Sequence, residues 1–190
     1  MTRLVVISAP SGGGKTTLCK KLLTDVPQLV LSISSTTRKP RGSERHGTEY
    51  YFLEKSEFET KASARLFAEW ALVHGNYYGT SKEIIERAFT QGKSVLLDID
   101  VQGAASLKKA YPEHYFGLFI TPPSIEILEK RLRARGTDSE ETIQKRLANA
   151  RSEMAQTGSF DHIIINDELE RAYRELLGYV THAIGAGENG

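Results

Sequence analysis

A glycine-rich turn close to the N-terminus constrains the fold more than any other feature of this sequence. It reads Ser-Ala-Pro-Ser-Gly-Gly-Gly-Lys-Thr-Thr over residues 8–17, at the end of the apolar run Leu4–Ser8 and the start of a helical pattern. Glycines let the backbone curl so that successive N–H groups converge, and the N-terminus of the next helix adds partial positive charge. This strand–turn–helix unit, with Gly14-Lys15-Thr16 in it, is typical of a loop that cradles phosphates.

The loop departs from the usual pattern at Ala9, where the first glycine would stand. The alternative is a glycine-rich turn with an exposed lysine, but the position between strand and helix favours the phosphate loop. We therefore predict nucleoside triphosphate binding, with Lys15 at the β- and γ-phosphates and the Thr16 hydroxyl on Mg²⁺. The apolar run Val95–Ile99 carries Asp98, which is expected near the metal, and Asp100 is a second candidate on the same side.

Apolar runs alternate with helical patterns along most of the chain. The runs are continuous, as in a parallel sheet covered on both faces, so we predict an α/β core. The predicted strands are Leu4–Ser8, Val95–Ile99, Tyr115–Ile120 and His162–Ile165, and the predicted helices are Lys15–Leu23, Lys82–Gln91, Gln102–Tyr111, Ser124–Arg135, Ser139–Gln156 and Glu168–Ile184.

Two stretches interrupt this alternation. Residues 34–80 are polar and rich in turn residues, with aromatic pairs at Tyr50-Tyr51 and Tyr77-Tyr78, which predicts an inserted subdomain with small strands of its own. Residues 129–145 are basic around Gly136 and predict two helices joined by a mobile connection.

Composition excludes several classes of protein. The 190 residues carry a net charge of +1 and 39% hydrophobic residues, as in an ordinary globular domain. No apolar run approaches the ~20 residues that span a bilayer, and the N-terminal run is too short for a signal peptide. A single cysteine, Cys19, fits a reducing cytoplasm. We therefore expect a cytoplasmic protein without a nucleic-acid or membrane partner, and the sequence carries no signal for an oligomeric state.

The insert contains two arginines and four hydroxyl side chains within residues 34–41, Ser-Ser-Thr-Thr-Arg-Lys-Pro-Arg. Guanidinium groups at this spacing can converge on one phosphate, so the segment could bind a phosphate. The alternative interpretation of the same segment is a solvated loop without a ligand.

Seven motifs together closely resemble guanylate kinase. They cover nearly the whole chain in the same order and spacing: residues 8–16, residues 34–41, Gly-Asn-Tyr-Tyr-Gly-Thr (75–80), Leu-Asp-Ile-Asp-Val-Gln-Gly (97–103), Pro-Pro-Ser (122–124), Arg-Gly-Thr (135–137) and Ile-Asn-Asp (165–167). The resemblance implies a P-loop NTPase-type core, a β-rich GMP-binding insert and a helical lid, which transfer the γ-phosphoryl group of ATP to GMP with Mg²⁺. The corresponding segments are 1–33, 81–125 and 147–190 for the core, 34–80 for the insert and 126–146 for the lid.

The resemblance also assigns site residues. ATP would be bound by the loop and by the segment after the last strand: Ala9, Pro10, Ser11, Gly12, Gly13, Gly14, Lys15, Thr16, Thr17, Asn166 and Asp167. GMP would be bound by Ser34, Arg38, Arg41, Tyr50, Glu69, Tyr78, Thr80 and Asp100. The cations expected to act in catalysis are Lys15, Arg38, Arg131, Arg135 and Arg146, with Thr16 and Asp98 at the metal.

Two other functions are open to such a chain. A phosphokinase for a sugar phosphate would have no base to recognise, so Ser34 and Glu69 argue against it. A non-catalytic guanylate-kinase-like module that binds phosphopeptides would typically have lost phosphate-loop residues, whereas Gly14-Lys15-Thr16 is intact. We therefore expect an enzyme.

Overall fold

The computed structural model describes residues 1–10, 12–73, 75–134, 136 and 138–185. Ser11 and Arg135, two of the predicted site residues, lie outside this part of the chain.

Within the described residues, five parallel strands form the central sheet, in the order β2-β7-β1-β8-β9. They are β1 (Leu4–Ser8), β2 (Leu29–Leu31), β7 (Ser94–Asp98), β8 (Tyr115–Thr121) and β9 (His162–Ile165). Because the strands are parallel, their carboxyl ends meet at one edge of the sheet. The predicted parallel sheet is confirmed.

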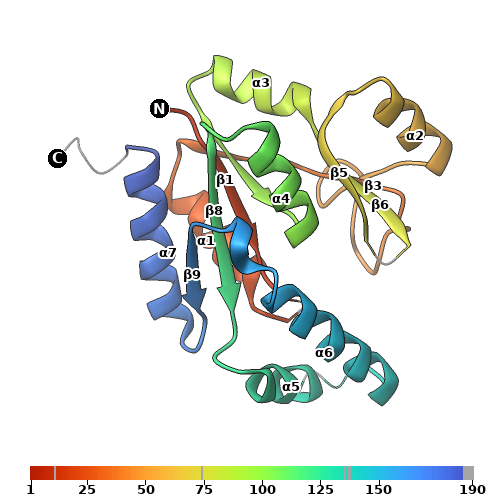
Figure 1. Ribbon diagram of the computed structural model, residues 1–190, viewed down its shortest axis with the longest axis vertical. Helices are drawn as coiled ribbons and strands as arrows, with labels where there is room; N and C mark the ends of the chain where they lie inside the picture. Colours follow the sequence, from red (N-terminus) through yellow and green to blue (C-terminus); the bar gives the residue numbers. More distant parts are fainter. Residues whose placement is uncertain (11, 74, 135, 137, 186–190) are drawn as a thin grey trace.

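Helices cover both faces of this sheet (Figure 1). Val5 and Ile7 pack against α1 (Lys15–Asp25) and α7 (Leu169–Ala183), whereas Leu4 and Val6 pack toward α3 (Lys82–Thr90) and α4 (Val101–Ala110). Successive residues of a strand point to opposite faces, so a continuous apolar run is required where both faces are covered.

The outermost strands depart from the sequence expectation. Residues Leu29–Leu31 form a short edge strand, β2, that was not predicted. At the other edge, Ile163 and Ile165 of β9 are 50% and 47% exposed, and only Ile164 joins the buried cluster against α7. The expectation of burial on both faces is therefore wrong for β9, because α7 covers just one of its faces.

The insert folds around a small sheet of its own. Its described strands lie in the order β4-β3-β6-β5 and comprise β3 (Ser35–Thr36), β4 (Tyr51–Phe52), β5 (Phe67–Val73) and β6 (Asn76–Ser81). A helix that was not predicted, α2 (Lys55–Ser63), anchors to this sheet through Phe58, whose ring stacks on Phe67 and Tyr77. Trp70 contacts the same ring by its edge but stays half exposed.

Two helices lie at the opposite side of the molecule from α3 (Figure 1). They are α5 (Ile125–Ala134) and α6 (Glu140–Met154), followed by the short helix η1 (Thr157–Ser159). The predicted core positions of this pair are all buried against each other: Leu128, Leu132, Ile143 and Leu147. The connection between the helices lies partly outside the described residues.

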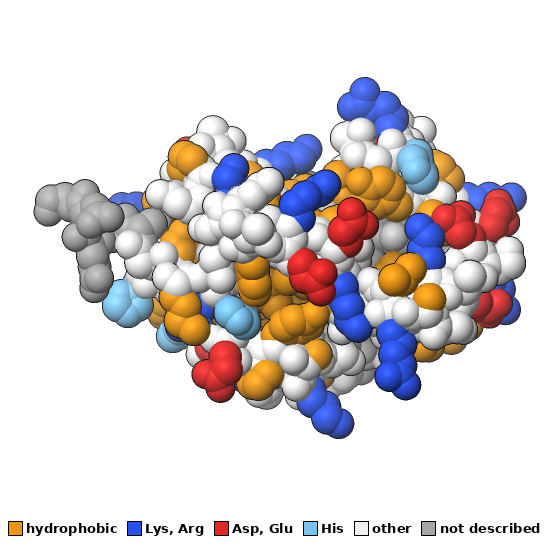
Figure 2. Space-filling model, turned by 90° about the horizontal axis from the view of Figure 1, so that it is seen from above, with side chains coloured by type: hydrophobic (Ala, Val, Ile, Leu, Met, Phe, Trp, Pro, Cys, Tyr) orange, Lys and Arg blue, Asp and Glu red, His pale blue; other side chains and the backbone are white. Residues whose placement is uncertain are grey.

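No helix in the described ranges has both the length and the apolar character needed to cross a membrane. On the face seen in Figure 2, basic side chains are scattered among acidic and apolar ones instead of forming one basic patch.

The buried strand β7 provides a test of the core. Leu96 is fully buried on the face of the sheet that packs against α1 and α7. Leu96→Ala should lower the free energy of unfolding by about 2–5 kcal/mol, because it removes buried methyl groups and leaves a cavity. Denaturant unfolding followed by circular dichroism measures the change. The control Leu72→Ala, at a side chain 54% exposed on the insert, should cost under about 0.5 kcal/mol. Equal losses in the two variants would contradict the assigned core.

Candidate active site

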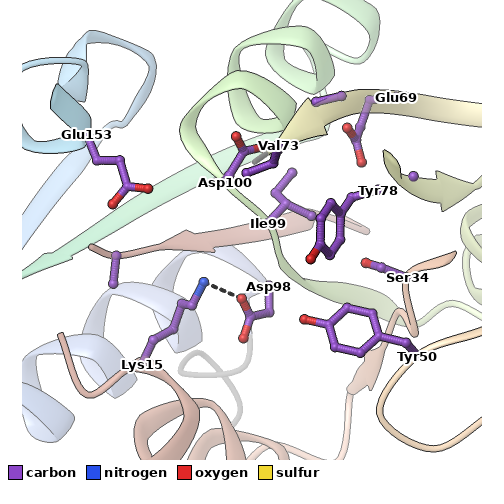
Figure 3. A pocket seen from close by; sticks show the side chains of 13 residues that line it. Lys15, Ser34, Tyr50, Glu69, Val73, Tyr78, Asp98, Ile99, Asp100 and Glu153 are labelled. Atoms are coloured by element: carbon purple, nitrogen blue, oxygen red, sulfur yellow. Dashed lines mark ion pairs between the residues drawn. The ribbon is translucent and has the colours of Figure 1, made fainter. Parts of the chain in front are cut away.

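One cavity of about 240 Å³ lies where the phosphate loop, the insert and α6 face each other (Figure 3). Lys15 and Asp98 lie on one side of it, Ser34, Tyr50, Tyr78 and Glu69 on the other, and Glu153 enters from α6. Residues far apart in the sequence therefore share one half-open cavity, in which charged and hydroxyl groups lie among apolar atoms. Five of the eight predicted GMP-binding positions line this cavity, together with Ala9 and Lys15 of the predicted ATP-binding set.

The phosphate loop has the geometry that its glycines predict. The Gly13 N–H donates to the Pro10 carbonyl at 2.8 Å, which closes the turn. Gly14 precedes the first residue of α1 with φ of 88°, a conformation that other residues adopt only at a cost. A Cβ at Gly14 would lie 2.4 Å from the Asn166 amide nitrogen, so the position also lacks room. Thr16 and Thr17 are exposed on the first turn of α1.

Lys15 forms an ion pair with Asp98 at the carboxyl edge of the central sheet. The pairing of β1 with β7 places Ile7 beside Asp98, and the loop that follows β1 brings Lys15 back to the same edge. Burial alone would lower the pKa of Lys15, but the Asp98 carboxylate outweighs it and holds the pKa above its usual value. The ammonium therefore stays charged, as binding of phosphate groups requires.

Asn166 is committed to the phosphate loop. Its side chain is 5% exposed, and its amide nitrogen donates to the Gly13 carbonyl at 2.8 Å. Arg131 of α5 donates to the Asn166 carbonyl at 2.8 Å and to the Asp167 carbonyl at 3.3 Å. Asn166 and Asp167, the two residues expected to bind ATP after the last strand, thus join α5 to the loop, with Asp167 exposed beside it.

Arg38 is held at the insert side of the site by several partners. Its guanidinium group donates to both carboxylate oxygens of Glu44, at 2.9 and 3.0 Å, and to the Tyr78 hydroxyl at 3.2 Å. It also lies over the Tyr50 ring, 5.3 Å from the ring centre. The hydrogen bonds that Arg38 donates to Glu44 and Tyr78 raise its pKa further above its already high value, against the opposing effect of burial. Arg41 is exposed, and its backbone N–H donates to Glu44 at 2.8 Å.

Glu69 is a buried carboxylate at the far end of the cavity, 7% exposed. The Thr80 hydroxyl donates to it at 2.6 Å, and Asp100 lies close by, with one oxygen accepting from the Gly103 N–H at the start of α4. Burial raises the pKa of the Glu69 carboxyl to about 7, opposed by the hydrogen bond from Thr80 and reinforced by the Asp100 charge. Glu69 is therefore a buried carboxylate, although the neighbouring Trp70 is half exposed. Ser34 is buried on the same wall of the cavity.

The expected metal ligands offer oxygen atoms of the right kind. Thr16 and Asp98 line a common hollow with Tyr50, on the α1 side of the site. A hydroxyl and a carboxylate are hard ligands of the type that Mg²⁺ prefers, and Mg²⁺ usually keeps waters and substrate phosphates as its remaining ligands. The described residues include no group of three or more His, Cys, Asp or Glu side chains that could hold an ion alone. The residues fit a metal that arrives with a nucleotide.

The predicted lid cations differ in placement. Arg131 contacts the backbone beside the phosphate loop, whereas Arg146 of α6 forms an ion pair with Asp138 at 3.3 Å. Neither lines the cavity in this conformation of the protein.

Sequence reasoning missed two residues of the site. Glu44 holds Arg38, and its only signal was an acidic residue six positions after an arginine in a turn. Glu153 lines the cavity from α6, where it lies seven residues after Arg146 and so on the same face of the helix. A lone glutamate on a charged helix gave no signal for this position.

A parallel α/β sheet with a lysine-bearing phosphate loop at its carboxyl edge defines a P-loop NTPase fold. A model of the guanylate kinase family matches residues 1–183. The chain belongs to this family.

Relatives and a solved structure agree. The chain is 49% identical over 177 residues to "Guanylate kinase" of Aromatoleum aromaticum, covering 93% of this chain and 86% of the relative. It is 51% identical over 173 residues to "Guanylate kinase" of Oleidesulfovibrio alaskensis, covering 91% and 84%. The crystal structure of guanylate kinase from Anaplasma phagocytophilum superposes with a TM-score of 0.78 at 32% identity, covering 95% of this chain and 85% of that one. This protein is accordingly an enzyme that phosphorylates GMP to GDP with ATP.

The high pKa of Glu69 gives a testable pH dependence. The family resemblance places Glu69 at the base of GMP, where only an ionised carboxylate could accept hydrogen bonds from both N1–H and N2–H₂ of guanine. Below pH 7 the carboxyl of the free enzyme takes up a proton. Protonation of Glu69 should therefore lower kcat/KM for GMP by up to about tenfold for each pH unit below 7. Steady-state assays between pH 5.5 and 8.5 measure this.

GMP itself titrates in the same range, since phosphate monoesters lose their second proton near pH ~6. The variant Glu69→Gln separates the two effects, because it should lose the inflection near 7 and keep the lower one. An unchanged inflection near 7 in Glu69→Gln would contradict the assignment.

Proposed function

We propose that the phosphate-loop side of the cavity binds ATP and the insert side binds GMP, so that the γ-phosphoryl group passes between Lys15 and Arg38. The observation that carries this proposal is that Lys15 and Asp98 share one cavity with Ser34, Tyr78 and Glu69. The loop N–H groups and the Lys15 ammonium hold the β- and γ-phosphates of ATP. Arg38, Arg41, Tyr50 and Tyr78 bind the phosphate of GMP.

Guanine is selected by hydrogen-bond polarity. Its N1–H and N2–H₂ groups are donors, and an ionised Glu69 can accept from both, while the Ser34 hydroxyl donates to O6. Adenine has an acceptor at N1, so the Glu69 carboxylate would face a lone pair. Thr80 and Asp100 act on Glu69: Thr80 fixes one oxygen by its hydrogen bond, and Asp100 adds a second acidic group at the base.

The chemical step needs cations and alignment. Two polyanions must approach in line, and their repulsion is the first barrier. The attacking phosphate oxygen of GMP is already largely ionised at neutral pH, so no general base is required. Lys15 and Arg38 supply positive charge from the two walls, and Arg131, Arg135 and Arg146 supply it from the segment 126–146.

We assign the segment 34–80 as the GMP-binding insert and 126–146 as the lid, on a core of 1–33, 81–125 and 147–190. Thr16 and Asp98 would hold Mg²⁺ together with the nucleotide and water. The bound ion supplies positive charge that shields the phosphates and orients them. For Asp98 to act there, Lys15 must exchange it for the ATP phosphates.

We also propose that the enzyme works in the cytoplasm on free ATP and GMP, without a nucleic-acid or membrane partner. The buried free thiol of Cys19 and the near-neutral net charge support this.

A substrate panel tests the base selectivity. ADP release should be measured by a coupled assay with GMP, AMP, CMP and UMP as acceptors. GMP should be preferred over AMP by up to about 10⁴-fold in kcat/KM, because buried polar groups without partners reject the wrong base. Comparable rates with GMP and AMP would overturn the assignment of Ser34 and Glu69.

The lysine of the phosphate loop provides a second test. Lys15→Met should reduce kcat by about 10²–10³-fold, the usual cost of losing one charged contact to the transition state. GMP binding, measured by calorimetry, should stay within about twofold, because Lys15 serves the ATP phosphates. The control Lys20→Met removes an exposed ammonium from the same helix and should leave kcat unchanged. A Lys15→Met enzyme that kept a tenth of its activity would contradict the assignment.

A further inference from the structure

The Glu44 carboxylate accepts three hydrogen bonds from two residues of its own loop. One carboxylate oxygen accepts from Arg38 at 2.9 Å and from the Arg41 N–H at 2.8 Å, and the other accepts from Arg38 at 3.0 Å. The Glu44 N–H donates in turn to the Arg41 carbonyl at 3.0 Å, which closes the turn between these residues. The carboxylate oxygen that accepts from Arg38 therefore also accepts a second hydrogen bond within this turn, from the Arg41 N–H.

The other side of the Arg38 guanidinium is fixed as well. Its Nε–H donates to the Tyr78 hydroxyl on β6, and one Nη1 hydrogen donates to the Lys39 carbonyl at 2.8 Å. Within the described residues, four of the five N–H donors of a guanidinium group are thereby used. Arg38 is held in a single orientation between Glu44 and Tyr78, with its side chain 10% exposed.

We propose that Glu44 is a positioning residue for GMP: it holds the Arg38 guanidinium and the turn at Arg41 in the arrangement that receives the GMP phosphate. This rests on the proposed roles of Arg38 and Arg41. The carboxylate need not touch the substrate. Its hydrogen bonds to Arg38 and to the Arg41 N–H keep it ionised, with a pKa below the usual value.

The pair of Arg38 and Glu44 differs from the pair of Lys15 and Asp98. The difference decides whether Glu44 positions Arg38 or only occupies the phosphate site until GMP displaces it. Lys15 and Asp98 belong to different segments that meet at a sheet edge, so ATP can take the place of Asp98 without disturbing either segment. Arg38 and Glu44 lie six residues apart in one closed turn, and Arg38 is tethered independently to Tyr78. A carboxylate that only occupies the phosphate site as a placeholder, until GMP displaces it, would not be hydrogen-bonded within the turn itself.

The first test compares Glu44→Gln with the wild type. Gln keeps the shape of Glu44 but replaces one acceptor oxygen by an NH₂ group, which faces the guanidinium donors. The value of kcat/KM for GMP should fall by about 10- to 100-fold, the usual consequence of losing a charge-assisted hydrogen bond. The KM for ATP should change by less than about twofold, since the ATP side is untouched. A rise in GMP affinity would identify Glu44 as a placeholder and overturn the proposal.

Guanosine distinguishes positioning of the phosphate site from general damage to the insert. Guanosine lacks the phosphate, so its inhibition constant against GMP should be the same in Glu44→Gln and in the wild type. Equal weakening of guanosine and GMP would indicate a merely structural role and would overturn the proposal.

The matched control is Glu49→Gln. Glu49 lies in the same loop and also accepts a backbone hydrogen bond, from the Arg45 N–H at 2.7 Å, but not from Arg38. It should leave kcat/KM for GMP unchanged. A loss as large as that of Glu44→Gln would show that any acidic side chain of the loop has this effect.

A double-mutant cycle tests the route through Arg38. In an Arg38→Met background, Glu44→Gln should have much less effect than in the wild type. Fully additive losses would exclude action through Arg38. Wild-type turnover of GMP is measured first: its absence would refute the proposed function, whereas its presence with an unaffected Glu44→Gln enzyme would refute only the role of Glu44.

Discussion

The parallel pairing of β1 with β7 is the constraint on which the site depends. It sets Ile7 beside Asp98, so the loop that leaves β1 and the acid that ends β7 emerge at the same edge of the sheet. Apolar burial fixes this register, because a shift by one residue would turn Val5 and Ile7 away from α1 and α7. The position of Lys15 against Asp98 is therefore a consequence of core packing and not of a local interaction between the two groups.

Three of the described cations that are expected to act at the phosphates have a carboxylate partner, whereas Arg131 and the exposed Arg41 form no such ion pair among the described residues. Lys15 lies against Asp98, Arg38 against Glu44 and Arg146 against Asp138. A site that collects positive charge for two polyanions must remain folded when both are absent, and carboxylates reduce the repulsion among the cations. The partners differ in origin, however. Glu44 belongs to the same turn as its arginine, whereas Asp98 comes from another strand and is itself an expected metal ligand.

Much of the core could be predicted from local sequence, since apolar runs such as Val95–Ile99 and the glycines before Lys15 carry strong signals. The two elements that were missed have weak ones: β2 is three residues long, and α2 buries only Phe58 among nine residues. The exposure of Ile163 could not be predicted, because its sequence does not say that β9 lies at an edge.

In the site, too, the features with a strong local signal could be predicted and the others could not. Residue types in the phosphate loop indicated their chemistry, and the family resemblance supplied the positions on the insert. The partners of those residues depend on tertiary structure. The bond from Asn166 to Gly13 joins residues 153 positions apart, and no local pattern encodes it.

That bond also limits how the enzyme can close. Gly12 faces Leu128 and Leu132, with 3.1 Å from its Cβ position to each side chain, and Arg131 is bonded to the segment that holds Gly13. The base of α5 is thus packed directly on the phosphate loop. A rigid swing of the whole segment 126–146 would pull these contacts apart and disturb the loop that has to hold ATP. Arg146 lies beyond this anchored base, on α6. Because α6 packs on α5 through Leu128, Leu132, Ile143 and Leu147, the contacts of α5 with the phosphate loop also restrain α6, and the same apolar cluster that holds the helix pair together ties the position of Arg146 to the loop.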